Sequence, residues 1–125
     1  QSRMGLTYLF ISHNLAVVRQ VSDQIGVMYL GRIAELAPAE SLFRRPRHPY
    51  TRALMEAIPD LDMTGRARIP VGGEVPSPIT PPTGCAFHPR CPLAGPRCKA
   101  ERPELKPAVD AMVACHAVEE GRDAA

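Results

Sequence analysis

The first half of the chain alternates apolar runs with short polar clusters. Residues 6–11, LTYLFI, are continuously apolar and rich in aromatic and β-branched side chains, which is typical of a strand covered on both faces in a parallel α/β sheet. Apolar side chains then recur every three residues over 15–21, which predicts a helix capped by Ser12 or Asn14. The predicted strand therefore ends at a histidine, His13, immediately before a helix.

A hairpin and two helices are predicted next. Residues 24–30 and 33–36 flank Gly31-Arg32, and a glycine at the first central position suits the two-residue turn of a β-hairpin. A short helical turn is expected over 38–43. A second helix is expected to begin at Pro49, where proline is tolerated, and to bury one apolar face. That face consists of Tyr50, Leu54 and Ile58.

Composition changes after this point and divides the chain into four parts. Residues 1–58 form the α/β part. Prolines are dense over 59–83, which excludes a helix or a central strand and predicts an extended connector. Residues 84–116 hold all four cysteines, and 117–125 are a polar tail. The predicted fold is thus α/β with a small irregular cysteine-rich extension.

Charge and hydropathy exclude several classes of protein. The net charge is only +2, and the chain has no Trp and few other aromatic residues, which argues against a nucleic-acid partner. No apolar run approaches the roughly 18 to 20 residues of a membrane-spanning helix, and no secretory signal is present. We therefore expect a soluble, cytoplasmic protein. Because the chain begins at Gln1, we also expect it to be the later part of something longer.

His13 has a position that suits ligand binding. In open α/β sheets, ligands bind beyond the carboxyl ends of the strands, where helix N-termini also converge. Position alone nevertheless favours the alternative, a structural histidine whose ring satisfies a local backbone group.

Two stretches, "GLTYLFISHNLAVVRQVSDQIGVMYLGRIAELAPAESLF" and "RHPYTRALMEAIP", resemble the C-terminal part of the ATP-binding subunits of ABC importers for dipeptides and oligopeptides. The resemblance implies that His13 contacts the γ-phosphate of ATP and the attacking water, as a neutral imidazole could. Asn14 stands where many relatives have Asp. The stretch HPYT, residues 48–51, marks the peptide-importer branch and its nickel-importing relatives, although it is also simply a good start for a helix.

The resemblance implies the end of an ABC-type nucleotide-binding domain, whose full-length protein binds ATP with Mg²⁺ and energises peptide import by ATP hydrolysis. The implied partners are a second ATP-binding subunit, identical or different, two membrane-spanning permease subunits and, indirectly, a peptide-binding protein. These would hold the protein at the inner face of the cell membrane. The sequence contains no phosphate-binding loop, no apolar run ending in Asp-Glu and no Leu-Ser-Gly-Gly signature, so the chain alone should not hydrolyse ATP.

Clustered cysteines point to a metal. A reducing cytosol disfavours disulfides, and thiols among prolines are typical of ligands that organise a segment around a metal. Zinc sites usually show paired Cys-x-x-Cys motifs, which are absent, whereas an iron-sulfur cluster tolerates wider spacing; disulfides or free thiols stay open. The candidate ligands are Cys85, Cys91, Cys98 and Cys115.

The stretch "GCAFHPRCPLAGPRCKAERPELKPAVDAMVACH" also resembles the extension of peptide-importer ATPase subunits. The resemblance implies a four-iron four-sulfur cluster on these four cysteines. His88 and His116 are close enough to substitute as ligands but are expected to lie outside the ligand set. Nearby cations would offset the charge of a four-thiolate site, or would simply be a solvated basic surface. They are Arg90, Arg97, Lys99, Arg102 and Lys106.

A competing hypothesis is a stand-alone iron-sulfur or zinc-binding interaction module, in which the first half only packs or recruits a partner. A non-functional remnant is a third. An importer fragment should bind ATP only when an upstream half is restored, whereas a module should be folded and metal-loaded without it.

Overall fold

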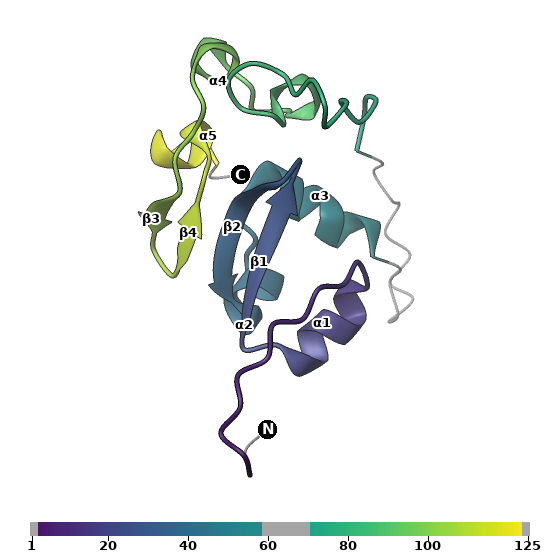
Figure 1. Cartoon of the computed structure of the whole chain (residues 1–125). Coiled ribbons are helices and arrows are strands. Elements are labelled where there is room, and N and C mark those ends of the chain that lie inside the picture. The colour runs from purple at the N-terminus through teal and green to yellow at the C-terminus, as the bar shows by residue number, and fades with distance from the viewer. Residues whose placement is uncertain (1–2, 59–70, 124–125) are drawn as a thin grey trace.

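The computed structural model describes residues 3–58 and 71–123, and its centre is a four-stranded antiparallel sheet of order β1-β2-β4-β3 (Figure 1). Strands β1 (Gln24–Tyr29) and β2 (Arg32–Pro38) form the predicted hairpin. Strands β3 (Lys106–Ala108) and β4 (Ala111–Val113) come from the cysteine-rich extension. The predicted α/β class is confirmed, and one sheet joins the two halves of the chain.

The hairpin turn lies one residue earlier than predicted. Tyr29 pairs with Arg32, so the two turn residues are Leu30 and Gly31, with φ of 45° and 78°. Two positive φ values are typical of a type I′ turn, whose twist matches the flanking strands. Arg32 therefore belongs to β2. This register keeps Ile25, Val27 and Tyr29 on the buried face of β1, whereas a slip of one residue would expose all three.

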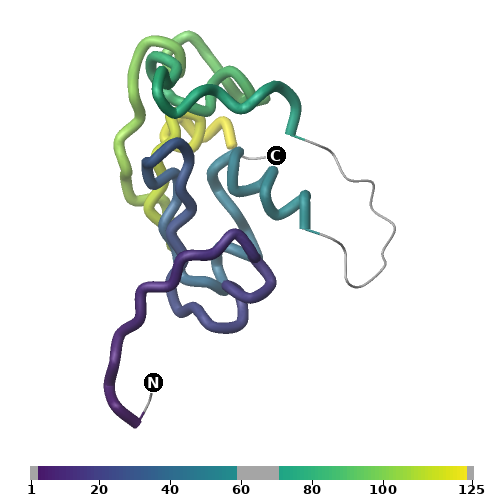
Figure 2. Tube along the Cα trace, turned by 45° about the vertical axis from the view of Figure 1, so that its right-hand side comes forward, coloured from purple at the N-terminus to yellow at the C-terminus, as the bar shows by residue number. Residues whose placement is uncertain are grey.

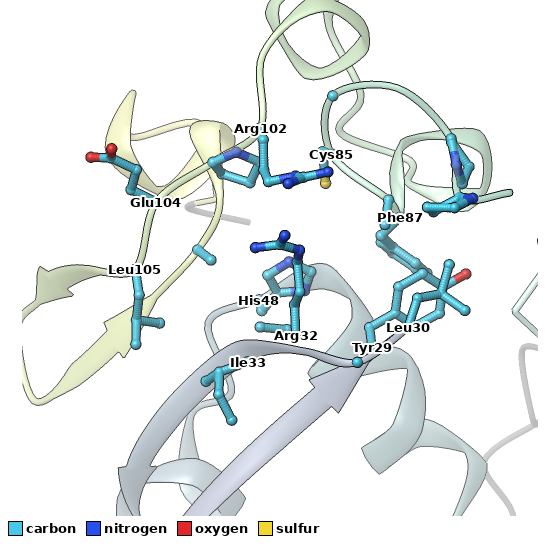
Figure 3. Close-up of a pocket in the computed structure, with 18 residues that line it drawn as sticks. Tyr29, Leu30, Arg32, Ile33, His48, Cys85, Phe87, Arg102, Glu104 and Leu105 are labelled. Atoms are coloured by element: carbon cyan, nitrogen blue, oxygen red, sulfur yellow. The ribbon is translucent and has the colours of Figure 1, made fainter. Parts of the chain in front are cut away.

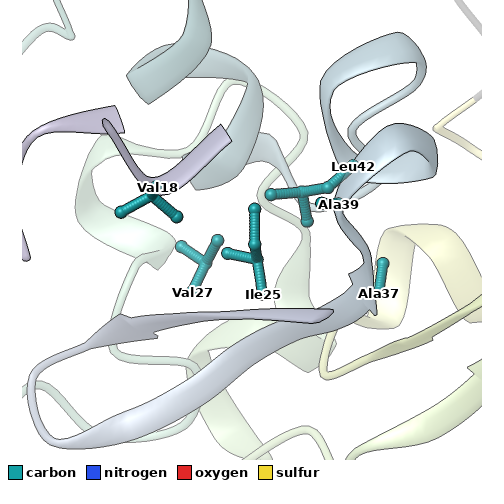
Figure 4. Packing of buried hydrophobic residues seen from close by; sticks show 6 residues of the cluster. All are labelled: Val18, Ile25, Val27, Ala37, Ala39 and Leu42. Carbon is teal, nitrogen blue, oxygen red and sulfur yellow. The ribbon is translucent and has the colours of Figure 1, made fainter. Parts of the chain in front are cut away.

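Three helices pack against this hairpin. Helix α1 (Leu15–Val21) begins where predicted, because the Asn14 Oδ1 accepts hydrogen bonds from the amides of Ala16 and Val17 at 3.1 and 3.3 Å. Helices α2 (Ala39–Arg44) and α3 (Pro49–Ala57) also begin near the predicted positions. Side chains from α1, β1, β2 and α2 form the main core (Figure 4), which comprises Val18, Ile25, Val27, Ala37, Ala39 and Leu42.

The apolar face of α3 is less buried than expected. Pro49 and Thr51 are its buried residues, whereas Tyr50 and Leu54 are partly buried and pack against the edge of the main core. Ile58, the third predicted residue, is the C-cap and is also only partly buried. The fully buried part of α3 is therefore its first turn.

The strand predicted over residues 6–11 is wrong for this structure. The segment is extended but belongs to no sheet, and Leu9 and Ile11 are 92% and 90% exposed. Both views show the N-terminal segment running away from the sheet (Figures 1 and 2). A strand needs a neighbour to pair its backbone groups, and none of the strands in the described part of the chain lies beside it. Its apolar side chains remain open to solvent.

The extension is compact although its secondary structure is sparse. Within the predicted connector, residues 71–83 form no helix or strand, while 59–70 lie outside the described residues. A 3₁₀ turn η1 (His88–Arg90) and helices α4 (Pro96–Ala100) and α5 (His116–Glu119) follow. Figure 2 shows the extension, green to yellow, folded beside the hairpin. No helix of residues 3–58 or 71–123 is long and apolar enough to cross a membrane.

Candidate functional site

His13 lies exposed between the extended N-terminal segment and α1. The residues on either side of it are held by local hydrogen bonds. The amide of Asn14 donates to the Ser12 Oγ at 3.0 Å, and the Asn14 side chain caps α1. The imidazole itself has no hydrogen-bond partner among the residues that the structure describes. His13 is thus presented at the surface by a defined turn.

The HPYT stretch is the junction between the hairpin and the extension. Glu35 of β2 has no exposed surface, and its two carboxylate oxygens accept the amides of Arg47 and His48, each at 2.9 Å. A buried carboxylate is tolerated only when its oxygens are hydrogen-bonded, so these two amides have to lie against β2. Glu35 thereby fixes the chain immediately before α3.

The His48 side chain connects this junction to the end of β4. Its Nδ1 accepts the Tyr50 amide at 3.0 Å and so caps α3, and the ring also hydrogen-bonds to the Ala114 carbonyl. Because Nδ1 is an acceptor, Nε2 carries the proton and donates to Ala114. The pKa of His48 is lowered to about 4, chiefly by burial and to a smaller extent by the nearby Arg52 charge, while the hydrogen bond to Ala114 opposes the shift. The imidazole is therefore neutral at physiological pH.

Phe87 anchors the loop that carries Cys85 and Cys91 to the same junction; this loop, residues 84–91, is called the first cysteine loop below. Its ring is only 2% exposed and lies 5.3 Å from Tyr29, 5.4 Å from Tyr50 and 5.9 Å from His48, measured between ring centroids. The Tyr29 and Tyr50 rings are 4.6 Å apart. Such aromatic groups contribute buried area and favourable edge-to-face contacts. Three residues from hairpin and helix therefore hold one residue of the extension.

The structure brings the four cysteines into one region, and all four are free thiols. Cys85 and Cys98 are linked through the backbone, since the Cys85 amide donates to the Cys98 carbonyl at 2.8 Å. The sulfurs of Cys85, Cys91 and Cys115 accept backbone amides two or three residues further along. The donors are Phe87 and His88 for Cys85, Leu93 for Cys91, and Ala117 and Val118 for Cys115.

Two opposing effects act on these thiols. The pKa values of Cys85 and Cys91 are raised, and that of Cys115 is raised to about 11. Burial is the main cause and the other cysteines of the group add to it, whereas the amide hydrogen bonds oppose it. Cys85, Cys91 and Cys115 are therefore protonated, uncharged thiols at neutral pH. In residues 3–58 and 71–123, no three Cys, His, Asp or Glu side chains are arranged to hold a single metal ion.

Arg122 is the cation that sequence reasoning missed. It donates to the Leu93 carbonyl at 2.8 Å, lies within hydrogen-bonding reach of the Cys98 sulfur, and its charge lowers the pKa of Cys91. Arg122 is also ion-paired with Glu120, and of the predicted cations Arg97 and Lys106 are likewise paired with glutamates. Arg122 lies outside the predicted segment, so only its three-dimensional position marks it.

The two histidines near the cysteines hydrogen-bond to backbone carbonyls. The Nδ1 of His88 lies 2.8 Å from the Cys85 carbonyl oxygen, and the Nε2 of His116 lies 3.0 Å from that of Glu101. The His116 Nδ1 is buried and has no hydrogen-bond partner in the described part of the chain. Both rings thus support the loops that carry the cysteines.

Comparison with known proteins gives a consistent result. Residues 34–98 match the family described as the oligopeptide/dipeptide transporter, C-terminal region. The chain is 55% identical over 93% of its length to a probable peptide ABC transporter ATP-binding protein of Sinorhizobium fredii. It is 52% identical over 96% of its length to a di/tripeptide transport ATP-binding protein of Pseudomonas aeruginosa, and 52% identical over 93% to an oligopeptide transport ATP-binding protein of Bacillus subtilis. The matches cover 33%, 38% and 36% of those proteins, about a third of their length.

Acid should weaken the junction through His48. The unfolded histidine titrates near pH 6.5 and the folded one near 4, so the unfolded state binds the extra proton between these values. The contribution of His48 to the free energy of unfolding is complete above pH 6.5 and is lost progressively as the pH falls from 6.5 to 4, by about 3 kcal/mol in all. Urea unfolding at pH 7 and pH 4.5 should show less of this loss in His48→Gln than in the unmodified chain. Equal losses in both proteins would contradict the assignment.

Gly84→Ala should separate the first cysteine loop from α4. Gly84 has φ of +70°, and an added Cβ would clash with the Cys98 carbonyl oxygen, a backbone atom that cannot move aside cheaply. Gly121→Ala is the matched control, because its φ is +69° with no atom within 4 Å of the added Cβ. We expect faster amide exchange around Cys85 and Cys98 in Gly84→Ala only. Similar exchange in both variants would show that the close approach is unimportant.

Proposed function

Because the chain belongs to the family of the oligopeptide/dipeptide transporter C-terminal region, we propose that it is part of the ATP-binding subunit of an ABC transporter that imports dipeptides or oligopeptides. In the complete subunit, ATP hydrolysis energises import. The observation that carries this proposal is similarity over at least 93% of the chain to three proteins named as peptide transport ATP-binding proteins. The open apolar face of residues 6–11 supports it, because such a face suits burial against further protein.

His13 acts in this proposal as the contact to the γ-phosphate of ATP and to the attacking water. Its exposed imidazole is unpartnered in the part of the chain that the structure describes, so it can donate a hydrogen bond without breaking one. Positioning and electrostatic stabilisation supply most of the catalysis in phosphoryl transfer, and a well-placed donor serves both. The Asn14 cap and the packing of α1 on the core hold His13 in place.

The same family context supports a four-iron four-sulfur cluster on Cys85, Cys91, Cys98 and Cys115. Amide hydrogen bonds to three of the sulfurs, together with the Arg122 guanidinium beside Cys98, suit thiolates that carry negative charge. Because burial raises the pKa of Cys85, Cys91 and Cys115, metal loading has to release protons and should be favoured at higher pH. Zinc is the second candidate, although the sequence lacks Cys-x-x-Cys pairs.

The proposed subunit works with partners. A second ATP-binding subunit, identical or different, completes the nucleotide sites, and two membrane-spanning permease subunits hold the pair at the inner face of the cell membrane. A peptide-binding protein delivers the substrate to the permeases and touches this subunit only indirectly. The length of the peptide, or a choice of nickel instead, is set by those other components.

His13→Ala in the complete ATP-binding subunit, assembled with its permeases, should lower the ATPase rate by about 100-fold or more while ATP binding persists. The reason is that the lost contact acts on the transferring phosphoryl group rather than on the rest of the nucleotide. Arg45→Gln, an exposed position beyond α2, is the control and should retain full activity. An unchanged ATPase rate in His13→Ala would refute this role.

Anaerobic loading of the chain with iron and sulfide should incorporate four of each per chain if the cluster proposal is right. The measurement is metal and sulfide content with the visible absorption of the product. Cys98→Ser should lose most of the iron, whereas Ser77→Ala, an exposed hydroxyl of the connector, should bind as much as the unmodified chain. Binding of one zinc per chain without iron would overturn the cluster and favour the zinc alternative.

A further inference from the structure

A cavity of about 640 Å³ lies between the hairpin turn and the extension (Figure 3). Its apolar walls come from the hairpin, the end of the connector, the first cysteine loop and the residues after α4. They include Tyr29, Leu30, Pro82, Phe87 and Leu105. Volumes of this size are typical of pockets that enclose small organic molecules. Neither His13 nor α1 takes part in the cavity.

Two arginines enter this cavity from opposite walls. Arg32 is the first residue of β2, and Arg102 follows α4 in the extension; Figure 3 shows both guanidinium groups in the space between these walls. Within residues 3–58 and 71–123, neither forms an ion pair or a side-chain hydrogen bond. Arg47, Arg52, Arg97 and Arg122, in contrast, all face carboxylates. Both side chains are also exposed to solvent, so their guanidinium groups are free to bind an anion that lies between them.

The cavity contains one carboxylate, and it lies apart from the two arginines. Glu104 belongs to the lining, but Figure 3 shows its carboxylate at the outer rim, pointing away from Arg32 and Arg102. The charge that faces the interior is therefore positive. The opposite end of the cavity, near Tyr29 and Phe87, is aromatic.

We propose that this cavity binds a small organic oxyanion, a carboxylate or a phosphate monoester, whose apolar body packs against the aromatic wall. Arginine forks match both groups in geometry and form charge-assisted hydrogen bonds with them. The cavity is too large and too apolar for an inorganic anion to fill it. This site does not depend on the proposed ATPase role.

Both arginines are carried on ordered backbone. The type I′ turn and the pairing of Tyr29 with Arg32 fix the start of β2, while the Glu101 carbonyl beside Arg102 lies 3.0 Å from the His116 Nε2. His48 and Ala114 of the junction also line the cavity. A bound anion would contact the hairpin and the extension together, so it should stabilise their association by mass action.

The test is a titration of the 125-residue chain with phenyl phosphate, followed by amide chemical shifts of Gly31, Arg32 and the residues next to Arg102. Benzoate replaces the phosphate with a carboxylate, phenol removes the charge, and inorganic phosphate removes the apolar body. We expect saturable binding of phenyl phosphate or benzoate, with phenol and inorganic phosphate each at least about tenfold weaker. If phenyl phosphate binds more tightly than benzoate, the site prefers a phosphate monoester; if benzoate binds more tightly, it prefers a carboxylate.

Variants locate the binding. Arg32→Gln and Arg102→Gln should each weaken the better probe by about tenfold, whereas Arg45→Gln, an exposed arginine outside the cavity, should not change its affinity. The proposal is overturned if neither aromatic anion binds saturably, if phenol binds as tightly as they do, or if Arg45→Gln weakens binding as much as the other two. Arg32 and Arg102 are exposed, so replacing either one should leave the fold intact. Unchanged amide chemical shifts away from the cavity will show that each variant is folded.

Discussion

A buried carboxylate with two backbone donors sets the geometry of this molecule. Glu35 has no exposed surface, and burying its carboxyl group requires the amides of Arg47 and His48 that reach its two oxygens. That requirement places the start of α3 against β2 and leaves the His48 ring facing the extension. The ring then donates to Ala114, the residue before Cys115. One buried, hydrogen-bonded side chain in a strand thereby positions a helix, a histidine and the segment that carries Cys115.

The junction makes the extension part of the same body as the hairpin. β4 pairs with β2 through Glu35 and Val113, and Phe87 packs among Tyr29, Tyr50 and His48. His13 is linked to this body through α1, whose Val18 packs in the main core with Ile25 and Val27. The proposed nucleotide contact and the cysteine group therefore lie at two ends of one continuous packing arrangement.

The sequence predicted the starts of helices correctly where the cause lies within a few neighbouring residues. The Asn14 cap and Pro49 at the start of α3 follow from hydrogen bonds and dihedral limits within a few residues. The hairpin was predicted with its turn one residue late, because the register depends on which side chains face the core. The strand expected over residues 6–11 failed because apolar composition indicates burial, and burial needs neighbours that the described residues do not supply.

The rest of the site depends on contacts between distant residues. Strands β3 and β4 have only three residues each, which is too short for a clear alternating pattern. Pro107 also argues against a strand in the sequence, although proline is tolerated in an edge strand such as β3. The grouping of four cysteines was expected from their spacing. Nothing in that spacing pointed to Arg122 beside Cys98, or to His48 as the residue that ties α3 to Ala114. Reading HPYT as a helix start was correct but incomplete, since its histidine also holds the extension.

Hydrogen exchange of the native chain tests most directly whether the hairpin and the extension form one unit. The Ala114 amide donates to the Ala34 carbonyl at 2.9 Å, across the boundary between the two. The account predicts that this amide exchanges with the same opening free energy as the paired amides of β1 and β2. Exchange of Ala114 faster by several orders of magnitude, with the hairpin still protected, would show that the extension opens independently and that the Glu35 and His48 junction does not hold it.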